Sequence, residues 1–425
     1  MSSGEYLVGG KIMIALMGLA TRLQVESVKE TYEIIEKNLR GIYQRNYGIV
    51  ADGGALEEII ANLEHYEILI IAVLTGGTRK LIVRLGQLQK ITVLISNTKQ
   101  NALASALHAL YIVSKINKKI WHIHGEPSKL PWDLIRRVIL GVKELVAMRG
   151  NKIVLMGVPK QYLDDEGYDI NNLRRKLGIS IETISLNEFI VAVEKAEPDK
   201  NILNKIASMR REHVKGDDTE RKIAKIYSAT ISLLGNSIGG GIRCFPIISK
   251  LGVTPCLVVS DLLDKDKIFV CEADLAIAIT MLFARKITGE MPFVANPVAI
   301  DEKNRMILAH CTAATKLFIS EAKIVSHFET GLGYAVQGDF RENQVVTLLK
   351  IDPSFSKMFI TRGRIVRGKK FSDEFCRNQL VVQLSRTPIS FLTGEFAHHL
   401  AVIYGDHVEE VEFAAKLLGF GVVYE

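Results

Sequence analysis

Three polar residues each follow a short apolar, strand-like run, and a histidine pair stands near the C-terminus. Glu272, Asn296 and His310 are the three, and His398-His399 closes the segment GEFAHH. Ligands of α/β proteins usually bind where strands end at an open crevice, so we expect Glu272, Asn296 and His310 to converge there. One carboxylate and two imidazoles, completed by an amide or carboxylate oxygen, suit an octahedral site for Mn²⁺ or a similar divalent ion.

Such a set of groups suits proton transfer between adjacent carbons, of which the conversion of an aldose to a ketose is one example. Conversion of an aldose to a ketose passes through an ene-diolate, whose negative charge a divalent cation can stabilise. A carboxylate must take and return the proton, and Glu272 can do this alone if its conjugate acid delivers to the neighbouring carbon. The Asn296 amide can ligate a hard cation but cannot carry a proton. The chemistry is therefore one-base or water-mediated, or it has changed or been lost.

The elements that must position these residues form three successive patterns. Up to about residue 125, apolar runs at 11–16, 49–51, 68–74 and 91–95 alternate with helical stretches, which predicts a parallel sheet covered on both faces. A second α/β pattern begins near residue 150, and a helix is expected over 274–288 with Gly289 as its C-cap. From about residue 293 short β-like runs dominate. We interpret 239–241 (GGG) as a bend and 256–259 as strand-like.

Composition excludes several classes of protein. A chain of 425 residues, 48% hydrophobic and 24% charged, predicts two or three ordinary globular domains at roughly 150 residues each. No apolar run approaches the ~20 residues of a membrane-spanning helix, and the N-terminus lacks a secretory pattern, so we expect a cytoplasmic protein with no membrane partner. Five scattered cysteines without a CxxC pair indicate reduced thiols.

The net charge of +7 raises the question of a nucleic-acid partner. The basic candidates are Arg210-Arg211 and residues 362–370 (RGRIVRGKK), both short and interrupted by other residue types. With 54 basic against 47 acidic residues, a solvated surface explains the charge better than a nucleic-acid footprint does. No nucleic-acid partner is predicted.

Four motifs in order point to a known family. CEADL at 271–275, FVANP at 293–297, LAHCT at 308–312 and GEFAHH at 394–399 resemble the L-fucose isomerase and L-arabinose isomerase superfamily, specifically its shorter fucose isomerase-like branch. The resemblance runs from about residue 68 to the end. Supporting matches are TGGT at 75–78, RCFP at 243–246 and FETGLG at 328–333.

The resemblance implies a fold and an assembly. It implies an α/β fold with two Rossmann-like parallel-sheet domains, 1–150 and 151–295, followed by a β-rich, barrel-like C-terminal domain, 296–425. The family's oligomers imply a homo-trimer or homo-hexamer in which the first domain contributes to a neighbour's active site.

The resemblance also implies roles for the polar residues. Glu272 matches a metal-binding glutamate that acts as acid or base, His310 matches a metal-binding histidine, and the second residue of the pair, His399, matches the other imidazole ligand. Asn296 stands where the family has a carboxylate that ligates the metal and moves a proton. From the sequence alone, which of His398 and His399 ligates is nearly even.

Five residues are candidate contacts to the substrate. They are Arg243, Glu329, Gln337, His398 and Thr78. Glu329 and Asp301 are also candidates to replace the missing carboxylate, although Asp301 fits a turn better.

Glu272 and His310 also have structural explanations that involve no bound ligand. The role of Glu272 can be limited to a favourable interaction with the dipole of the following helix. His310 can be a buried core histidine. His122 and His124 share one face of a strand and fit a surface or interface role.

These observations lead to two main hypotheses. The first is a Mn²⁺-type ketol isomerase acting on a monosaccharide such as L-fucose, L-arabinose or a related sugar. The second is a non-catalytic sugar-binding protein of the same fold. A nucleotide-dependent oxidoreductase is disfavoured because no GxGxxG follows an early strand.

Overall fold

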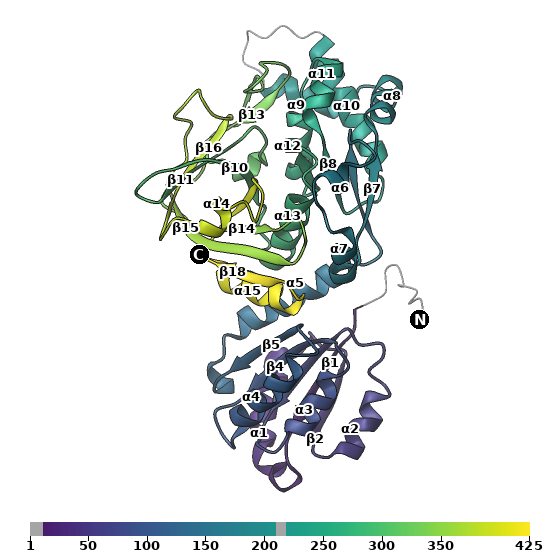
Figure 1. Ribbon diagram of the computed structural model, residues 1–425, viewed down its shortest axis with the longest axis vertical. Coiled ribbons are helices and arrows are strands. Elements are labelled where there is room, and N and C mark those ends of the chain that lie inside the picture. Colours follow the sequence, from purple (N-terminus) through teal and green to yellow (C-terminus); the bar gives the residue numbers. More distant parts are fainter. Residues whose placement is uncertain (1–11, 210–217) are drawn as a thin grey trace. The chain divides into compact units, whose positions relative to one another are not determined.

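The computed structural model describes residues 12–209 and 218–425, and groups the chain into two compact units (Figure 1). The first unit comprises the chain up to Ala147 together with Glu410–Gly421, and the second comprises Met148–Glu409 with Val422–Glu425. The Arg210-Arg211 basic candidate lies outside the described residues. The predicted division into three domains stays a prediction.

The first unit is built on a parallel five-stranded sheet. Its strands follow the order β2-β1-β3-β4-β5, the doubly wound arrangement that the alternating pattern predicts. Every residue of β1, β3 and β4 is buried, because helices cover both faces of the sheet. The strands are β1 (Ile14–Leu19), β2 (Arg45–Val50), β3 (Ile68–Val73), β4 (Ile91–Ser96) and β5 (Ile120–His124). The helices are α1 (Lys29–Leu39), α2 (Gly53–Ile60), α3 (Arg79–Gly86), α4 (Ala102–Val113) and α5 (Trp132–Val146).

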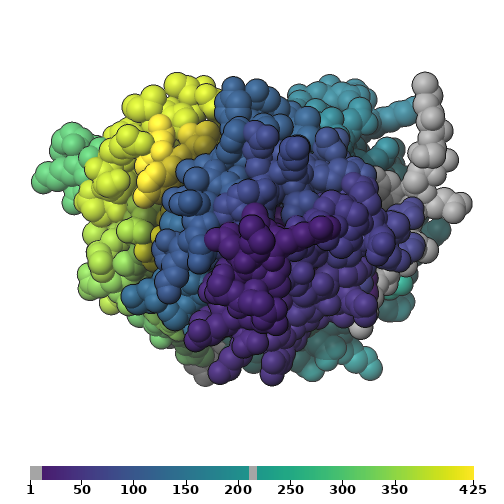
Figure 2. Space-filling view, turned by 90° about the horizontal axis from the view of Figure 1, so that it is seen from below, coloured from purple at the N-terminus to yellow at the C-terminus, as the bar shows by residue number. Residues whose placement is uncertain are grey.

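A helix from the far end of the chain completes the first unit. The Trp121 ring of β5 stacks on Phe413 of α15 (Val408–Leu417), with ring centroids 4.5 Å apart. Arg137 of α5 donates from Nε to Glu410 Oε1 at 2.8 Å. In Figure 2 the yellow C-terminal residues lie against the blue ones of this unit. The C-terminal helix α15 therefore packs on a strand that lies 292 positions earlier in the chain, counted from Trp121 to Phe413.

The second unit contains a four-stranded parallel sheet in the order β7-β6-β8-β9. Its strands are β6 (Lys152–Met156), β7 (Ser180–Ile184), β8 (Gly239–Ile242) and β9 (Ile268–Cys271). Its helices are α6 (Tyr162–Asp165), α7 (Ile170–Leu177), α8 (Leu186–Lys195), α9 (Lys200–Met209), α10 (Asp218–Leu234), α11 (Cys244–Leu251), α12 (Cys256–Asp264) and α13 (Leu275–Thr288).

A closed antiparallel barrel of six strands forms the rest of the second unit. The order is β14-β17-β10-β11-β16-β15, and pairing of β14 with β15 closes it, with β18 added beside β15. The strands are β10 (Phe293–Ile300), β11 (Arg305–His310), β14 (Val345–Ile351), β15 (Lys357–Arg367), β16 (Asn378–Leu384), β17 (Leu400–Tyr404) and β18 (Gly421–Tyr424). A small hairpin, β12 (Lys323–Val325) with β13 (Ala335–Gln337), and the short helix α14 (Ile389–Leu392) complete it. The predicted fold class is confirmed.

Helix α13 joins the parallel sheet to the barrel. It packs against β8 and β9 on one side and against β14 and β17 on the other. The Asp274 side chain accepts from Ile277 N at the start of the helix, and Gly289 ends it at φ +76°. The helix predicted over 274–288 is therefore confirmed. Among the described residues, no helix has the length and apolar character needed to cross a bilayer.

Two local predictions are wrong. Residues 239–241 are not a bend but the start of the central strand β8, and residues 256–259 lie in the buried helix α12 rather than in a strand. The three glycines did not indicate a strand because strand propensity depends on side chains, which glycine lacks. Neighbouring atoms leave no room for side chains at these positions. A Cβ on Gly240 would lie 2.6 Å from Val154 O and 3.0 Å from Phe269 Cε2.

We predict that Gly240→Ala destabilises the protein by about 2 kcal/mol, because the added methyl group meets a backbone oxygen that cannot move away. Urea unfolding measures the change. The control is Gly53→Ala, since Gly53 begins α2 and a Cβ there meets nothing within 4 Å. An unfolding midpoint for Gly240→Ala equal to that of the wild type would contradict the packing described here.

Candidate active site

Glu272 sits on a strained turn directly after β9. Glu272 and Ala273 have φ of +59° and +54°, in the left-handed region that non-glycine residues rarely adopt. The Tyr162 hydroxyl donates to Glu272 O at 3.0 Å and reaches Ala273 O at 3.3 Å, while Ala273 N donates to Ile242 O. Two consecutive residues in this region are held only where the surroundings fix them, a feature typical of functional sites.

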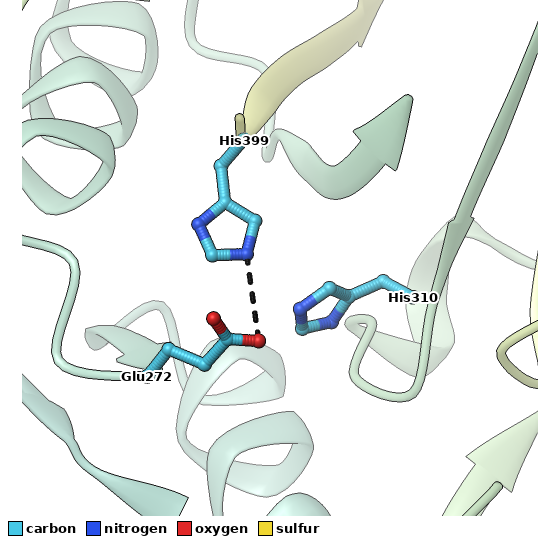
Figure 3. A group of neighbouring side chains, drawn as sticks. All are labelled: Glu272, His310 and His399. Atoms are coloured by element: carbon cyan, nitrogen blue, oxygen red, sulfur yellow. Dashed lines mark ion pairs between the residues drawn. The ribbon is translucent and has the colours of Figure 1, made fainter. Parts of the chain in front are cut away.

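Three of the predicted metal ligands converge (Figure 3). Glu272 from the end of β9, His310 from the end of β11 and His399 from just before β17 offer ligand atoms that all lie within 4.8 Å of one another. His399 Nε2 lies 3.9 Å from Glu272 Oε1, and the two imidazole rings are 5.5 Å apart. Both histidines are buried, so this arrangement is not a chance meeting of surface side chains.

A buried carboxylate fixes the orientation of His399. The Nδ1 atom of His399 lies 2.8 Å from Asp274 Oδ2, and Lys350 Nζ contacts the same oxygen at 2.9 Å. A carboxylate at Nδ1 holds the proton on that nitrogen, which leaves Nε2 with a free lone pair. His399 Nε2 is buried and has no hydrogen-bond partner among the described residues. A lone pair without a partner in the interior is what a cation would satisfy.

Asn296 comes between the two histidines in the barrel sheet. It pairs with Ala309, the residue before His310, and its neighbour Ala295 pairs with Leu400, the residue after His399. Asn296 Oδ1 is also buried without a hydrogen-bond partner in the described part of the chain. Two partnerless buried acceptors in neighbouring strands therefore fit a divalent cation, with Asn296 supplying an amide oxygen.

His310 is also held by a neighbour. The Thr312 hydroxyl lies 2.7 Å from His310 Nδ1, and Thr312 N approaches the same atom at 3.1 Å. Thr312 therefore restrains the ring of His310, but its N–H makes Nδ1 of His310 an acceptor, whereas Nδ1 of His399 faces the Asp274 carboxylate as in metal-binding histidines.

The electrostatic environment keeps the cluster in the protonation state that binds cations. The hydrogen bond with His398 and the nearby His399 and His310 lower the pKa of Glu272 to about 2. Burial lowers the pKa of His310 to about 3. Burial opposes ionisation of Asp274, but Lys350 and His399 outweigh it and hold the pKa of Asp274 well below its usual range. An ionised carboxylate beside neutral imidazoles is the form that binds a metal.

A cavity of about 500 Å³ opens beside the cluster. It lies at the carboxyl ends of the parallel strands, next to the β6/β8 position where the strand order reverses and where such sheets usually bind ligands. Its volume suits a small polar molecule. Its lining includes Tyr162, Glu166, Tyr168, Arg243, Phe245, Glu272, Asp274 and His398.

The structure distinguishes the two histidines that the sequence left open. The His399 side chain is 1% exposed and points at the cluster, whereas that of His398 is 59% exposed, lines the cavity and lies 3.3 Å from Glu272 Oε2. This placement agrees with His399 as the proposed ligand, but Asp274, His398 and His399 also form a candidate cation group, so the assignment of the pair stays a prediction.

The other predicted contacts are spread out. Arg243 lines the cavity. Burial raises the pKa of Glu329, and the nearby charge of Glu272 raises it further. Neither Glu329 nor Gln337 of β13 lines the cavity. Thr78 is buried in the first unit, where its hydroxyl bonds to Thr75 O and Ser105 Oγ. Asp301 accepts from the backbone of Lys303 and Arg305, as a turn residue does.

Sequence reasoning missed four residues that support the site. They are Asp274, Lys350, Tyr162 and Tyr168. Asp274 stands two positions after Glu272 in CEADL, and Lys350 is the one charged residue in the apolar run VVTLLKI, so both left a signal in the sequence. Only the fold shows that they meet.

The fold and the cluster define a class: a protein of parallel sheets and a β-barrel, with a candidate cation centre beside a cavity for a small polar ligand. Sequence comparison adds relatives. The chain is 21% identical over 317 residues to "Sulfoquinovose isomerase" of Priestia aryabhattai, covering 70% of this chain and 69% of the relative, and equally to that of Priestia megaterium (strain ATCC 12872 / QMB1551). The protein of the same name from Clostridium sp. (strain MSTE9) is 26% identical over 268 residues, covering 58% and 59%.

No protein-family model matches the chain. The relatives are consistent with a sugar isomerase, while the L-fucose and L-arabinose isomerase relationship stays a prediction.

We predict that Lys350→Met destabilises the protein by about 3 to 5 kcal/mol, because it leaves the Asp274 carboxylate buried without its cation. Urea unfolding of the metal-free protein measures this. The control is Lys152→Met, which breaks the half-exposed ion pair with Glu182 and should unfold close to the wild type. Equal stability of the two variants would mean that the buried pair does not support the site.

Proposed function

We propose that this protein is a divalent-metal-dependent sugar isomerase that interconverts an aldose and a ketose. The observation that carries the proposal is the convergence of Glu272, His310 and His399 beside the cavity, with His399 Nε2 buried and without a hydrogen-bond partner among the described residues. The names of the three relatives support isomerisation of a sugar.

Glu272, His310, His399 and the Asn296 amide would hold the ion, with Mn²⁺ as the proposed metal. A bound divalent cation supplies positive charge for the negative oxygens of an ene-diolate. Asp274 and Thr312 keep the imidazoles turned toward the centre. The buried walls keep those orientations fixed, so no side chain has to reorganise during the reaction.

Glu272 is the proposed acid and base. It is the carboxylate of the cluster that also lines the cavity, so it can reach a sugar there. It takes a proton from one carbon and, as the carboxylic acid, returns it to the neighbouring carbon, while the hydroxyl proton passes from one of the two substrate oxygens to the other. His398, within 3.3 Å of the carboxylate, can hold Glu272 in place and hydrogen-bond to a sugar hydroxyl.

The substrate is proposed to be a hexose or a closely related sugar. Sulfoquinovose, a glucose in which a sulfonate replaces the 6-hydroxyl group, is the first candidate because the relatives are named for it. L-Fucose and L-arabinose follow from the resemblance of the motifs. A screen of these sugars with metal-stripped protein, with and without added Mn²⁺, tests the proposal: turnover of none of them in the presence of Mn²⁺ would overturn it.

We predict that Glu272→Gln lowers kcat/KM about 10³-fold, because the amide cannot accept the substrate proton. Turnover is followed by the appearance of ketose, and circular dichroism confirms the fold. Glu290→Gln is the control, since Glu290 is exposed at the end of the segment after α13. Glu272→Gln turnover equal to that of the wild type would remove Glu272 from the proposed mechanism.

We predict that Asn296→Asp tightens Mn²⁺ binding about tenfold, because a carboxylate replaces an amide among the oxygen ligands. Calorimetric titration of metal-stripped protein measures the affinity. Asn343→Asp adds the same charge at an exposed position of the barrel and should leave the affinity unchanged. Identical titrations for Asn296→Asp and the wild type would show that Asn296 is not a ligand.

A further inference from the structure

Among the described residues, the Arg243 side chain has no anionic partner, although it lines the cavity. It follows β8, caps α11, and is the one arginine or lysine that lines the cavity, whose acidic residues are Glu166, Glu272 and Asp274. Its guanidinium forms no ion pair and no hydrogen bond with any described residue, although it is partly buried and three carboxylates line the same cavity. A charged group that is partly desolvated and left unpaired is commonly a binding group.

The guanidinium is held by an aromatic ring rather than by an anion. Its Cζ lies 5.5 Å from the centroid of Tyr162, the residue whose hydroxyl supports the backbone of Glu272. Stacking on a ring restrains the guanidinium plane while leaving its N–H groups free for a bidentate contact. Tyr162 therefore contacts both the Arg243 guanidinium and the backbone of Glu272, the proposed base.

The start of α11 adds positive potential at the same place. Arg243 is the N-cap residue of this helix, and Cys244 and Phe245, which each have a backbone N–H, line the cavity together with Pro246, which has none. The first amides of a helix lack partners within the helix, and the helix dipole is positive at this end. An unpaired arginine beside a helix N-terminus is a favourable combination for a tetrahedral anion.

We propose that Arg243, with the first turn of α11, binds an anionic tetrahedral group carried by the sugar, a sulfonate or a phosphate remote from the reacting carbons. This inference rests on the proposed isomerase function, because it assigns the opposite end of the same substrate. The cation centre at Glu272 receives the carbonyl end, and Arg243 receives the charged end. A site built to pair a charge discriminates strongly against an analogue that lacks it.

The experiment compares three sugars that share a glucose frame: sulfoquinovose, glucose 6-phosphate and uncharged quinovose. For each we measure kcat/KM with Mn²⁺ and, by calorimetry, affinity for the metal-free protein. The variants are Arg243→Gln and Arg243→Lys. The control is Arg174→Gln, which removes the same charge from an exposed position on α7, away from the cavity lining.

We expect the wild type to prefer a charged sugar to quinovose, and Arg243→Gln to lower that preference about 100-fold. Arg243→Lys should restore part of the preference, because it keeps the charge but loses the bidentate contact. Arg174→Gln should behave as the wild type does. Preference for sulfoquinovose over glucose 6-phosphate, or the reverse, identifies the anion.

The outcomes separate the two proposals. Equal losses for charged and neutral sugars in Arg243→Gln, or a wild type without preference for an anion, would overturn the inference and leave the isomerase function standing. Sulfoquinovose or glucose 6-phosphate binding that depends on Arg243, in a protein that turns over none of the sugars, would support the inference and overturn the isomerase function. A wild type that binds no charged sugar would overturn the inference.

Discussion

The candidate site depends on one buried carboxylate, that of Asp274. Its oxygens cap α13 through Ile277 N, contact Lys350 of β14, and lie 2.8 Å from His399 Nδ1. A single side chain thus joins the parallel sheet, the helix that follows it and two strands of the barrel. Removing water from a carboxylate is costly unless hydrogen bonds and an opposite charge replace it, so these partners must all assemble together. The orientation of His399 is fixed as a consequence of packing the core of the second unit.

A second constraint acts on the backbone beside Asp274. The turn at Glu272 and Ala273 requires close approach to β8, and Gly241 of that strand permits it, because a Cβ there would lie 3.0 Å from Ala273 Cα. The strand of three glycines therefore has a positional role. Strand β8 lets the strained turn approach it closely. In that position Tyr162 bonds to the carbonyl oxygens of the turn, and Glu272 faces the two histidines.

Local signals allowed part of this arrangement to be predicted. Asp274 at one end and Gly289 at the other predicted α13, polar residues at the ends of apolar runs predicted Glu272 and His310, and the resemblance of the GEFAHH motif predicted His399. The strand β8 was missed because its glycines lack the side chains on which strand prediction depends. The pairing of Lys350 with Asp274 joins positions 76 apart, and no local periodicity reports such a contact. The difference in burial between His398 and His399 likewise became visible only in the fold.

The replacement of a carboxylate by Asn296 acquires a physical meaning in this setting. Under the proposed function, a second carboxylate ligand would add a negative charge beside a cavity already lined by Glu166, Glu272 and Asp274. An anionic sugar would be repelled by that charge, and repulsion is strong where water is excluded. The amide of Asn296 keeps an oxygen for the cation while removing the charge, and Lys350 offsets that of Asp274. Arg243 also lines the cavity and has no anionic partner among the described residues, so the balance of charge shifts toward accepting an anion. Asn296 is therefore consistent with a change of substrate. In such a change, weaker binding of the ion accompanies binding of a charged sugar.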